Sequence, residues 1–453
     1  MKQLALIFLL SISTLSIAQT EIQSLLTIDQ IMQGENFVGY VPEDIQWADN
    51  SNAIYFSWNP DKDTIRSTYE VNINTKKINK RSFEDLKLSP NSGDFSKDYK
   101  WEVYEKGGDL FLMNNTTYSA KRITNTSDIE SNPQFSGDQK SIIYQQSNNL
   151  FQWNIADGSI TQLTDFKTGK EKPESKPNAQ DQYLEDDQLK TSNILEKRKN
   201  EHDAQKYRRE ETRFERPKTI YTGDKSIAGL NILPNLNYVV YRLFTKPSEK
   251  NAIVPNYVTD SGYTTDLDSH SKVGSEQYTF ESWILNLQTG EHYQIKTDSI
   301  DGIRDKPKFL KEYAENSSEY DDEYENPRAV DIGNTVFSED GKAVVNITSS
   351  DHKDRWIMTV NLSNGTLKLI DRQHDDAWIG GPGVGWFSRG VIGWLDDDTI
   401  WFKSEKTGYA HLYSADIHSG KVTALTEGKF EILDISLSKD KKTFFLTSNK
   451  VSP

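Results

Sequence analysis

The chain has 453 residues, no cysteine, and 53 Lys and Arg against 68 Asp and Glu, which gives a formal net charge of -15. That charge argues against a nucleic-acid partner, because phosphate binding needs clustered cations. Without cysteine the chain can form no disulfide, thiol nucleophile or thiolate metal site. Its 10 Trp, 21 Tyr and 19 Phe favour a β-rich fold, since aromatic side chains pack well on pleated sheets.

Residues 1–18 are typical of a secretory signal peptide. Lys2 supplies the positive start, residues 4–12 form a short apolar core, and Ser16-Ile17-Ala18 places small residues where a signal peptidase cuts. The apolar core is too short to span a bilayer, and no later segment approaches the roughly 20 apolar residues that a spanning helix needs. We therefore expect a mature chain from residue 19, without an integral membrane segment, in the periplasm or the medium.

A short motif recurs along the mature chain: an aromatic residue or Leu, then a polar turn containing Asp or Asn, then a β-strand. Its copies begin at Trp47, Phe95, Phe135, Leu233, Phe337, Trp394 and Leu437. A second turn ending in Gly often closes the unit, as at residues 157–158, 289–290, 364–365 and 419–420. Such turns join antiparallel strands, so each unit predicts four short strands. The repeat of roughly 40 to 57 residues predicts an all-β propeller of seven to eight four-stranded blades, the last of them incomplete.

The spacing of the motif breaks between Phe135 and Leu233 and again between Leu233 and Phe337. Both gaps predict insertions within one propeller of residues 19–453. The first insertion covers about residues 170–217, of which 180–215 contain no Gly or Pro and predict one charged helix that projects or lies on a surface. Glu185-Asp186-Asp187 comes early in this helix, where the helix dipole is a sufficient structural reason for negative charge.

Two further segments predict loops. Residues 319–325 (EYDDEYE) lack the alternating ligand spacing of a calcium loop. Residues 380–385 (GGPGVG) lead to a predicted strand, whereas a nucleotide fingerprint opens a helix. The seven histidines are scattered, so we expect no metal site and no cofactor.

A catalytic serine of the α/β-hydrolase type is not recognisable in the sequence. No Gly-x-Ser-x-Gly elbow occurs, and the string at residues 385–390 (GWFSRG) has one residue too many before its serine. No run of alternating strands and helices predicts a parallel sheet. The last residues, 451–453, come one strand into a blade, so we expect a partial sequence without the catalytic domain.

Several longer strings resemble the propeller of the prolyl oligopeptidase and dipeptidyl peptidase IV family, in particular its bacterial exported members. The most specific is DDDTIWFKSE at residues 396–405 followed by GYAHLY at 408–413, and the others are DRWI at 354–357, HDDAW at 374–378 and VPNYVT at 254–259. The resemblance covers nearly the whole mature chain. It implies a propeller that caps an α/β-hydrolase domain and admits and positions peptides for cleavage, often after proline, in a parent enzyme that can be a homodimer.

The resemblance also implies a site for the substrate's free amine. Dipeptidyl peptidases of this family hold it with a Glu pair on a propeller helix. Glu185, Asp186 and Asp187 lie roughly where that helix comes, although the surrounding residues depart from the family's aromatic-rich pattern. Two other functions stay open: a non-enzymatic periplasmic propeller that binds peptides or envelope proteins, and a glycan enzyme with inward carboxylates about 5 to 10 Å apart on different blades.

Overall fold

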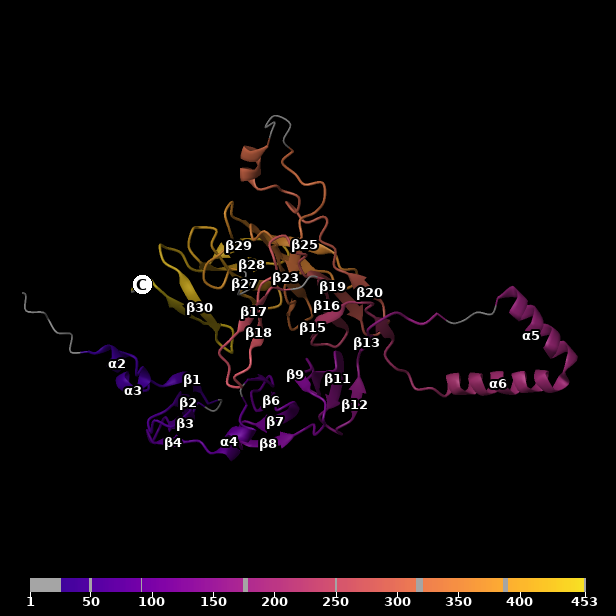
Figure 1. The fold of residues 1–453 in the computed structure, drawn as a ribbon, viewed down its shortest axis with the longest axis horizontal. Helices are drawn as coiled ribbons and strands as arrows, with labels where there is room; N and C mark the ends of the chain where they lie inside the picture. The colour runs from indigo at the N-terminus through magenta and orange to yellow at the C-terminus, as the bar shows by residue number, and fades with distance from the viewer. Residues whose placement is uncertain are drawn as a thin grey trace, which may run out of the picture. The chain divides into compact units, whose positions relative to one another are not determined.

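The structure is a computed structural model that describes residues 26–48, 51–90, 92–173, 178–248, 251–314, 321–385 and 390–451 (Figure 1). The predicted signal peptide and residues 452–453 lie outside the described residues. The chain divides into two compact units, Met1–Ser89 with Asn114–Ser119 and Pro90–Met113 with Ala120–Pro453.

The first unit contains one antiparallel sheet in the strand order β1-β2-β3-β4. Its elements are α2 Ile28–Ile31, α3 Glu35–Val38, β1 Glu43–Trp47, β2 Ala53–Trp58, β3 Ser67–Asn72, β4 Ile78–Lys80 and α4 Phe83–Leu88. Helix α4 begins at a capping box, in which Ser82 accepts from the N–H of Asp85 and Asp85 accepts from that of Ser82.

The second unit contains most of the strands, arranged in successive antiparallel sheets. The strands are β5 Gly93–Phe95, β6 Trp101–Lys106, β7 Asp109–Asn114 and β8 Ser119–Arg122; β9 Glu130–Phe135, β10 Ser141–Gln146, β11 Asn149–Asn154 and β12 Ile160–Gln162; β15 Ser226–Ile232, β16 Tyr238–Thr245, β19 Thr279–Asn286 and β20 His292–Gln294; β21 Val330–Ile332, β22 Val336–Phe337, β23 Ala343–Ser349, β24 Asp354–Val360 and β25 Leu367–His374; β26 Ile392–Trp394, β27 Thr399–Ser404, β28 His411–Asp416 and β29 Val422–Ala424; and β30 Ile432–Leu437 with β31 Phe444–Ser448. Each group separated by a semicolon is one sheet.

The recurring motif marks the same place in the sheets of four or more strands and in the β30–β31 pair. Its copies lie at the turns β1–β2, β5–β6, β9–β10, β15–β16, β22–β23, β26–β27 and β30–β31, although residues 49–50 of the first copy lie outside the described residues. The Gly-containing turns at 157–158, 289–290, 364–365 and 419–420 join the third strand of a sheet to the fourth. The predicted register of the repeat is therefore confirmed, while a closed ring of blades stays a prediction.

The sheets of the second unit pack on one another in chain order. Neighbouring residues of one strand point to opposite faces, and Val344 of β23 packs with the β26–β29 sheet while Val345 packs with the β15–β20 sheet. Ile142 and Ile143 of β10 divide in the same way between the sheet before and the sheet after. Strands buried on both faces explain the nearly continuous apolar runs of the sequence.

A cross-strand aromatic pair recurs between the second and third strands of several sheets. Directly opposed rings stack in the pairs Phe56–Tyr69, Tyr144–Phe151, Tyr241–Trp283 and Phe402–Tyr413. Paired aromatic side chains stabilise adjacent strands. The repeating unit therefore includes a packed aromatic pair as well as its turns.

The first predicted insertion contains two helices, so the prediction of one helix from 180 to 215 is wrong. Helix α5 Ala179–Thr191 ends and α6 Asn193–Glu211 begins at Ser192, which is extended and whose hydroxyl accepts from the N–H of Leu195. Ser and Thr side chains compete for helix hydrogen bonds and favour caps. The helical pair leaves and rejoins the sheets through the parallel strands β13 Asp165–Lys167 and β14 Thr219–Tyr221.

The second gap in the motif is filled by a hairpin and an irregular segment. The hairpin pairs β17 Ile253–Asn256 with β18 Thr265–Asp268, and the 3-10 helix η1 Lys308–Tyr313 follows after β20. Both insertions belong to the second unit. In the described part of the chain, no helix is long and apolar enough to cross a membrane.

Candidate functional site

The three carboxylates predicted to bind an amine lie in the middle of α5, not at its start. Asp181 occupies the first turn, so the helix dipole does not explain Glu185, Asp186 and Asp187. All three are exposed, and Glu185 Oε1 lies 2.9 Å from Lys199 Nζ of α6. The ion pair links the two helices, and the role of the three carboxylates stays a prediction.

A buried carboxylate, Asp354, lies at the start of β24 and gathers three side chains from other segments. Its side chain is fully buried and accepts from Arg328 Nη2 at 2.6 Å and from Arg372 Nε at 3.0 Å. His374 Nδ1 lies 2.9 Å from the same carboxylate. A charge taken out of water needs partners and hydrogen bonds of this kind. Asp354 therefore joins β24, β25 and the segment before β21.

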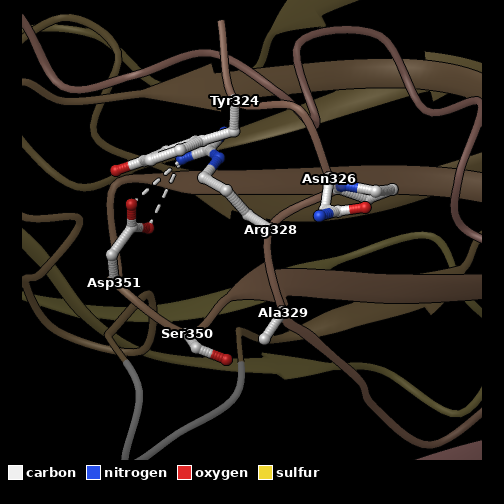
Figure 2. Close-up of a pocket in the computed structure, with 7 residues that line it drawn as sticks. Tyr324, Asn326, Arg328, Ala329, Ser350 and Asp351 are labelled. Atoms are coloured by element: carbon white, nitrogen blue, oxygen red, sulfur yellow. Dashed lines mark hydrogen bonds and ion pairs between the residues drawn. The ribbon is translucent and has the colours of Figure 1, made fainter.

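Arg328 lines an open pocket of about 300 Å³ that Figure 2 shows. Its Nη1 lies 3.1 and 3.4 Å from the two carboxylate oxygens of Asp351, and its Nη2 and Nε donate to the main-chain oxygens of Gly302 and Ile303. Tyr324 and other residues of the segment before β21 complete the wall. Arg328 thus fastens residues 302–303 to the β21–β25 sheet.

We expect this fastening to weaken in acid. Burial would raise the pKa of Asp351, but hydrogen bonds from Ser349 and from the main-chain N–H of Lys353, together with Arg328, hold that pKa below its usual value. A depressed pKa means stability that is present above the unfolded-state pKa and is lost as the pH falls through the folded one. Chemical denaturation of wild type and Asp351→Asn at several pH values below about 5 checks this. The loss should be smaller in the variant; equal losses contradict the assignment.

A larger cavity, of about 520 Å³, lies along the first strands of successive sheets. We call it the first-strand cavity. Its walls come from β9, β10 and β11, from β15, β16 and β19, and from the link between β21 and β22. Its polar lining residues include Asn132, Gln134, Asn231, Arg242, Asn334 and Thr335. The volume lies within the range of small-molecule and peptide sites.

Both β9 and β15 are edge strands of their sheets and both contain a bulge beside the first-strand cavity. The register of β9 shifts between its pairs with Ile143 and Gln145, where Asn132 has a positive φ of 52°. The register of β15 shifts between Ile227 and Gly229. Edge strands present unpaired main-chain groups, and bulges redirect side chains beside binding sites.

A second cavity, also of about 520 Å³, shares Asn132 and Gln134 with the first-strand cavity. Asp94 and Glu105 are its acidic lining residues. Burial raises the pKa of Asp94, although the main-chain N–H groups of Phe135 and Phe95 act in the opposite direction. The two cavities therefore differ in charge, because two carboxylates line the second cavity whereas no carboxylate is among the described lining residues of the first-strand cavity.

The remaining predicted segments are loops where the structure describes them. Residues 381–385 form turns, with Val384 and Gly385 donating to the main-chain oxygen of Gly381, and β26 follows. Residues 319–320 and 386–389 lie outside the described residues, and 321–323 and 325 are exposed. Among the described residues, no three His, Asp or Glu side chains are grouped so as to hold a metal ion.

Two of the strings noted in the sequence meet at Asp354, but they were not predicted from the sequence to form a common site. DRWI brings Asp354 itself, and HDDAW brings His374. The sequence offered one signal for this site, which is an ionisable residue at the start of a largely apolar strand. The amide side chains of the first-strand cavity carried no signal, because Asn and Gln in short strands are ordinary on exposed faces.

Comparison with known proteins gives one family. A family model described as the dipeptidyl peptidase IV (DPP IV) N-terminal region matches residues 234–453. Curated relatives named "Probable dipeptidyl peptidase 4", from Neosartorya fischeri and Aspergillus fumigatus, are each 25% identical over 223 residues, which is 48% of this chain and 26% of theirs. This chain therefore spans about a quarter of the length of those relatives.

A solved structure shares the fold. The crystal structure of Porphyromonas gingivalis dipeptidyl peptidase 4 matches with a TM-score of 0.50 and 13% identity, over 94% of this chain and 52% of that one. At this identity the likeness concerns the fold alone. The strand-rich architecture of the second unit agrees with it.

Proposed function

We propose that this chain, whose residues 234–453 match the family model of the dipeptidyl peptidase IV N-terminal region, is the β-propeller region of an exported serine peptidase. In this proposal seven to eight blades form the propeller, which admits short peptides and positions them. Cleavage is assigned to an α/β-hydrolase domain that lies outside residues 1–453. The signal-peptide pattern of residues 1–18 supports export to the periplasm or the medium.

The observation that carries the proposal is the first-strand cavity. Stacked sheets bring the bulged edge strands β9 and β15 to the walls of one polar cavity. An extended peptide can pair with exposed strand edges through its main chain, while pockets between them take its side chains. A surface of this kind suits a domain that holds peptides.

Glu185, Asp186 and Asp187 remain the proposed site for the free amine of such a peptide. Their exposure leaves them accessible, and the Lys199 partner of Glu185 sits on a neighbouring helix. An ammonium group can replace the lysine in that ion pair. Exposed ion pairs contribute little to stability, so replacing the lysine by the ammonium group of a peptide costs little free energy.

The test uses the full chain and two measurements. Calorimetric titration with the tetrapeptide Ala-Pro-Ala-Gly should show saturable binding, and Gly-Pro-p-nitroanilide should not be hydrolysed. Turnover that a serine-directed inhibitor blocks contradicts a catalytic domain outside the chain. Failure of every peptide to bind at millimolar concentration contradicts the propeller's role in holding substrate.

The same titration tests the amine site. The combined variant Glu185→Gln, Asp186→Asn, Asp187→Asn should weaken binding of the free-amine peptide and leave the N-acetylated peptide unchanged. The matched control carries Glu196→Gln, Glu201→Gln and Asp203→Asn on α6. Equal effects of both variants, or no effect of either, contradict the assignment.

A further inference from the structure

We propose that the first-strand cavity is a subsite for the uncharged main-chain amides of an extended peptide, with Thr335 and the amide side chains of its walls as the binding groups. This deepens the proposed function and rests on it. The ligand class is a neutral secondary-amide chain, and the charged ends of the peptide lie outside this cavity.

Charge in the cavity argues for a neutral ligand. Among the described lining residues, Arg242 and Tyr241 are the titratable ones. Arg242 forms an ion pair with Asp331, and its guanidinium lies 3.9 Å from the ring centre of Phe280. Burial raises the pKa of Tyr241, which therefore stays an uncharged phenol. An ionised ligand group would lose hydration here, and the cation that lines the cavity, Arg242, is already paired with Asp331.

The hydrogen-bonding groups of the cavity match a peptide main chain. Asn132, Gln134 and Asn334 each carry a donor and an acceptor, as does a secondary amide. The contact between Asn132 Nδ2 and Gln145 Oε1 is 3.5 Å long, at the limit for a hydrogen bond, so these side chains are weakly engaged with each other. Both side chains can therefore rotate to bind a ligand with little loss of free energy.

Thr335 supplies an independent observation. It is 5% exposed, it lines the cavity, and its Oγ1 has no hydrogen-bond partner among the described residues. Leaving a buried hydroxyl unsatisfied costs about 1–3 kcal/mol, and native proteins rarely do so without a reason. Rotation about its Cα–Cβ bond lets the hydroxyl bond to a ligand carbonyl in the cavity. The main chain of Thr335 is held meanwhile, because its carbonyl accepts from Asn231 Nδ2.

The edges of β9 and β15 favour a peptide over other neutral ligands. Each edge offers main-chain N–H and C=O groups at the spacing of a strand. The exceptions in β9 are Pro133, which has no N–H, and Glu130 and Phe135, whose N–H groups donate to the Gly108 carbonyl and the Asp94 carboxylate. The bulges interrupt that spacing and prevent the two edges from serving as an open template for aggregation. A short extended chain matches the stretches beside each bulge, because its main-chain groups repeat with the period of a strand.

The experiment compares blocked peptides on the full chain by calorimetric titration. Acetyl-Ala-Pro-Ala-Gly-amide should bind about tenfold more tightly than analogues in which the third residue is Lys or Glu. Thr335→Val, which keeps the shape and removes the hydroxyl, should weaken the blocked peptide by about two- to tenfold, the value of one net hydrogen bond. Its melting temperature should equal or exceed that of wild type, because an unsatisfied hydroxyl is removed. Thr359→Val on β24 is the matched control and should change neither value.

The outcomes separate the two proposals. If peptides bind but charge and Thr335→Val make no difference, the subsite assignment is wrong and the proposed function stands. Absence of binding by any peptide, blocked or free, contradicts both. Tight binding of maltotriose in place of the peptide shows that the amide side chains serve a neutral sugar, which also overturns the assignment.

Discussion

Replacing Asp354 by Asn should lower the free energy of unfolding by about 3–5 kcal/mol, the usual loss when one partner of a buried ion cluster is removed. Asp354 is fully buried, and Arg328, Arg372 and His374 all contact it. The amide keeps the shape but not the charge. The two guanidinium groups then lie close together with less negative charge between them. Urea unfolding followed by tryptophan fluorescence measures the loss and also reports on Trp356, whose ring lies 5.7 and 5.9 Å from the two guanidinium groups.

The matched control is Asp376→Asn at the edge of the same cluster. Its side chain is 59% exposed, and it pairs with Lys308 and His374. Solvent screens exposed pairs, so the loss should stay below about 1 kcal/mol. Losses of similar size in the two variants contradict the view that Asp354 organises the cluster.

Truncating Phe402 to Ala should cost about 3–5 kcal/mol of unfolding free energy. Phe402 is fully buried in β27 and stacks on Tyr413 of β28 with ring centres 5.9 Å apart. The same side chain belongs to a core cluster with Val344 and Ile357 of the preceding sheet. Its removal therefore leaves a cavity between two sheets. Equilibrium unfolding in urea gives the difference directly.

The control is Phe214→Ala. Phe214 follows α6 in the sequence, and its side chain is 89% exposed. That change should stay within about 0.5 kcal/mol of wild type, as surface substitutions do. The Phe402 variant should still unfold in one transition if the sheets stabilise each other. A separate early transition for residues after 390 contradicts stacking of the β26–β29 sheet on its neighbour.

The strand pattern could be predicted because its signals are local. Turns such as Asp157-Gly158 and Asn364-Gly365 need positive φ, which both glycines adopt at 74°. The alternation of Val344 and Val345 follows from strand geometry alone. The break at Ser192 was missed although it is also local, since helix propensity and capping compete there and composition does not decide between them.

The candidate sites needed the tertiary structure. Asp354 contacts Arg328, 26 residues before it, and Arg372, 18 residues after it. No local rule places those side chains on one carboxylate, because their meeting depends on how the inserted segment returns to the sheet. The first-strand cavity depends on Asn132 and Thr335, which are about 200 residues apart in sequence and meet only once successive sheets have stacked.

The sequence by itself determined the family resemblance, the repeat, its turns and the strands between them, since each of these depends on the conformational preferences of a few adjacent residues. Only the tertiary structure decided which polar groups share a cavity, which carboxylate is buried among cations, and that the Thr335 hydroxyl has no hydrogen-bond partner within the described part of the chain. Those features follow from burial and from contacts between distant segments, which no adjacent-residue preference encodes.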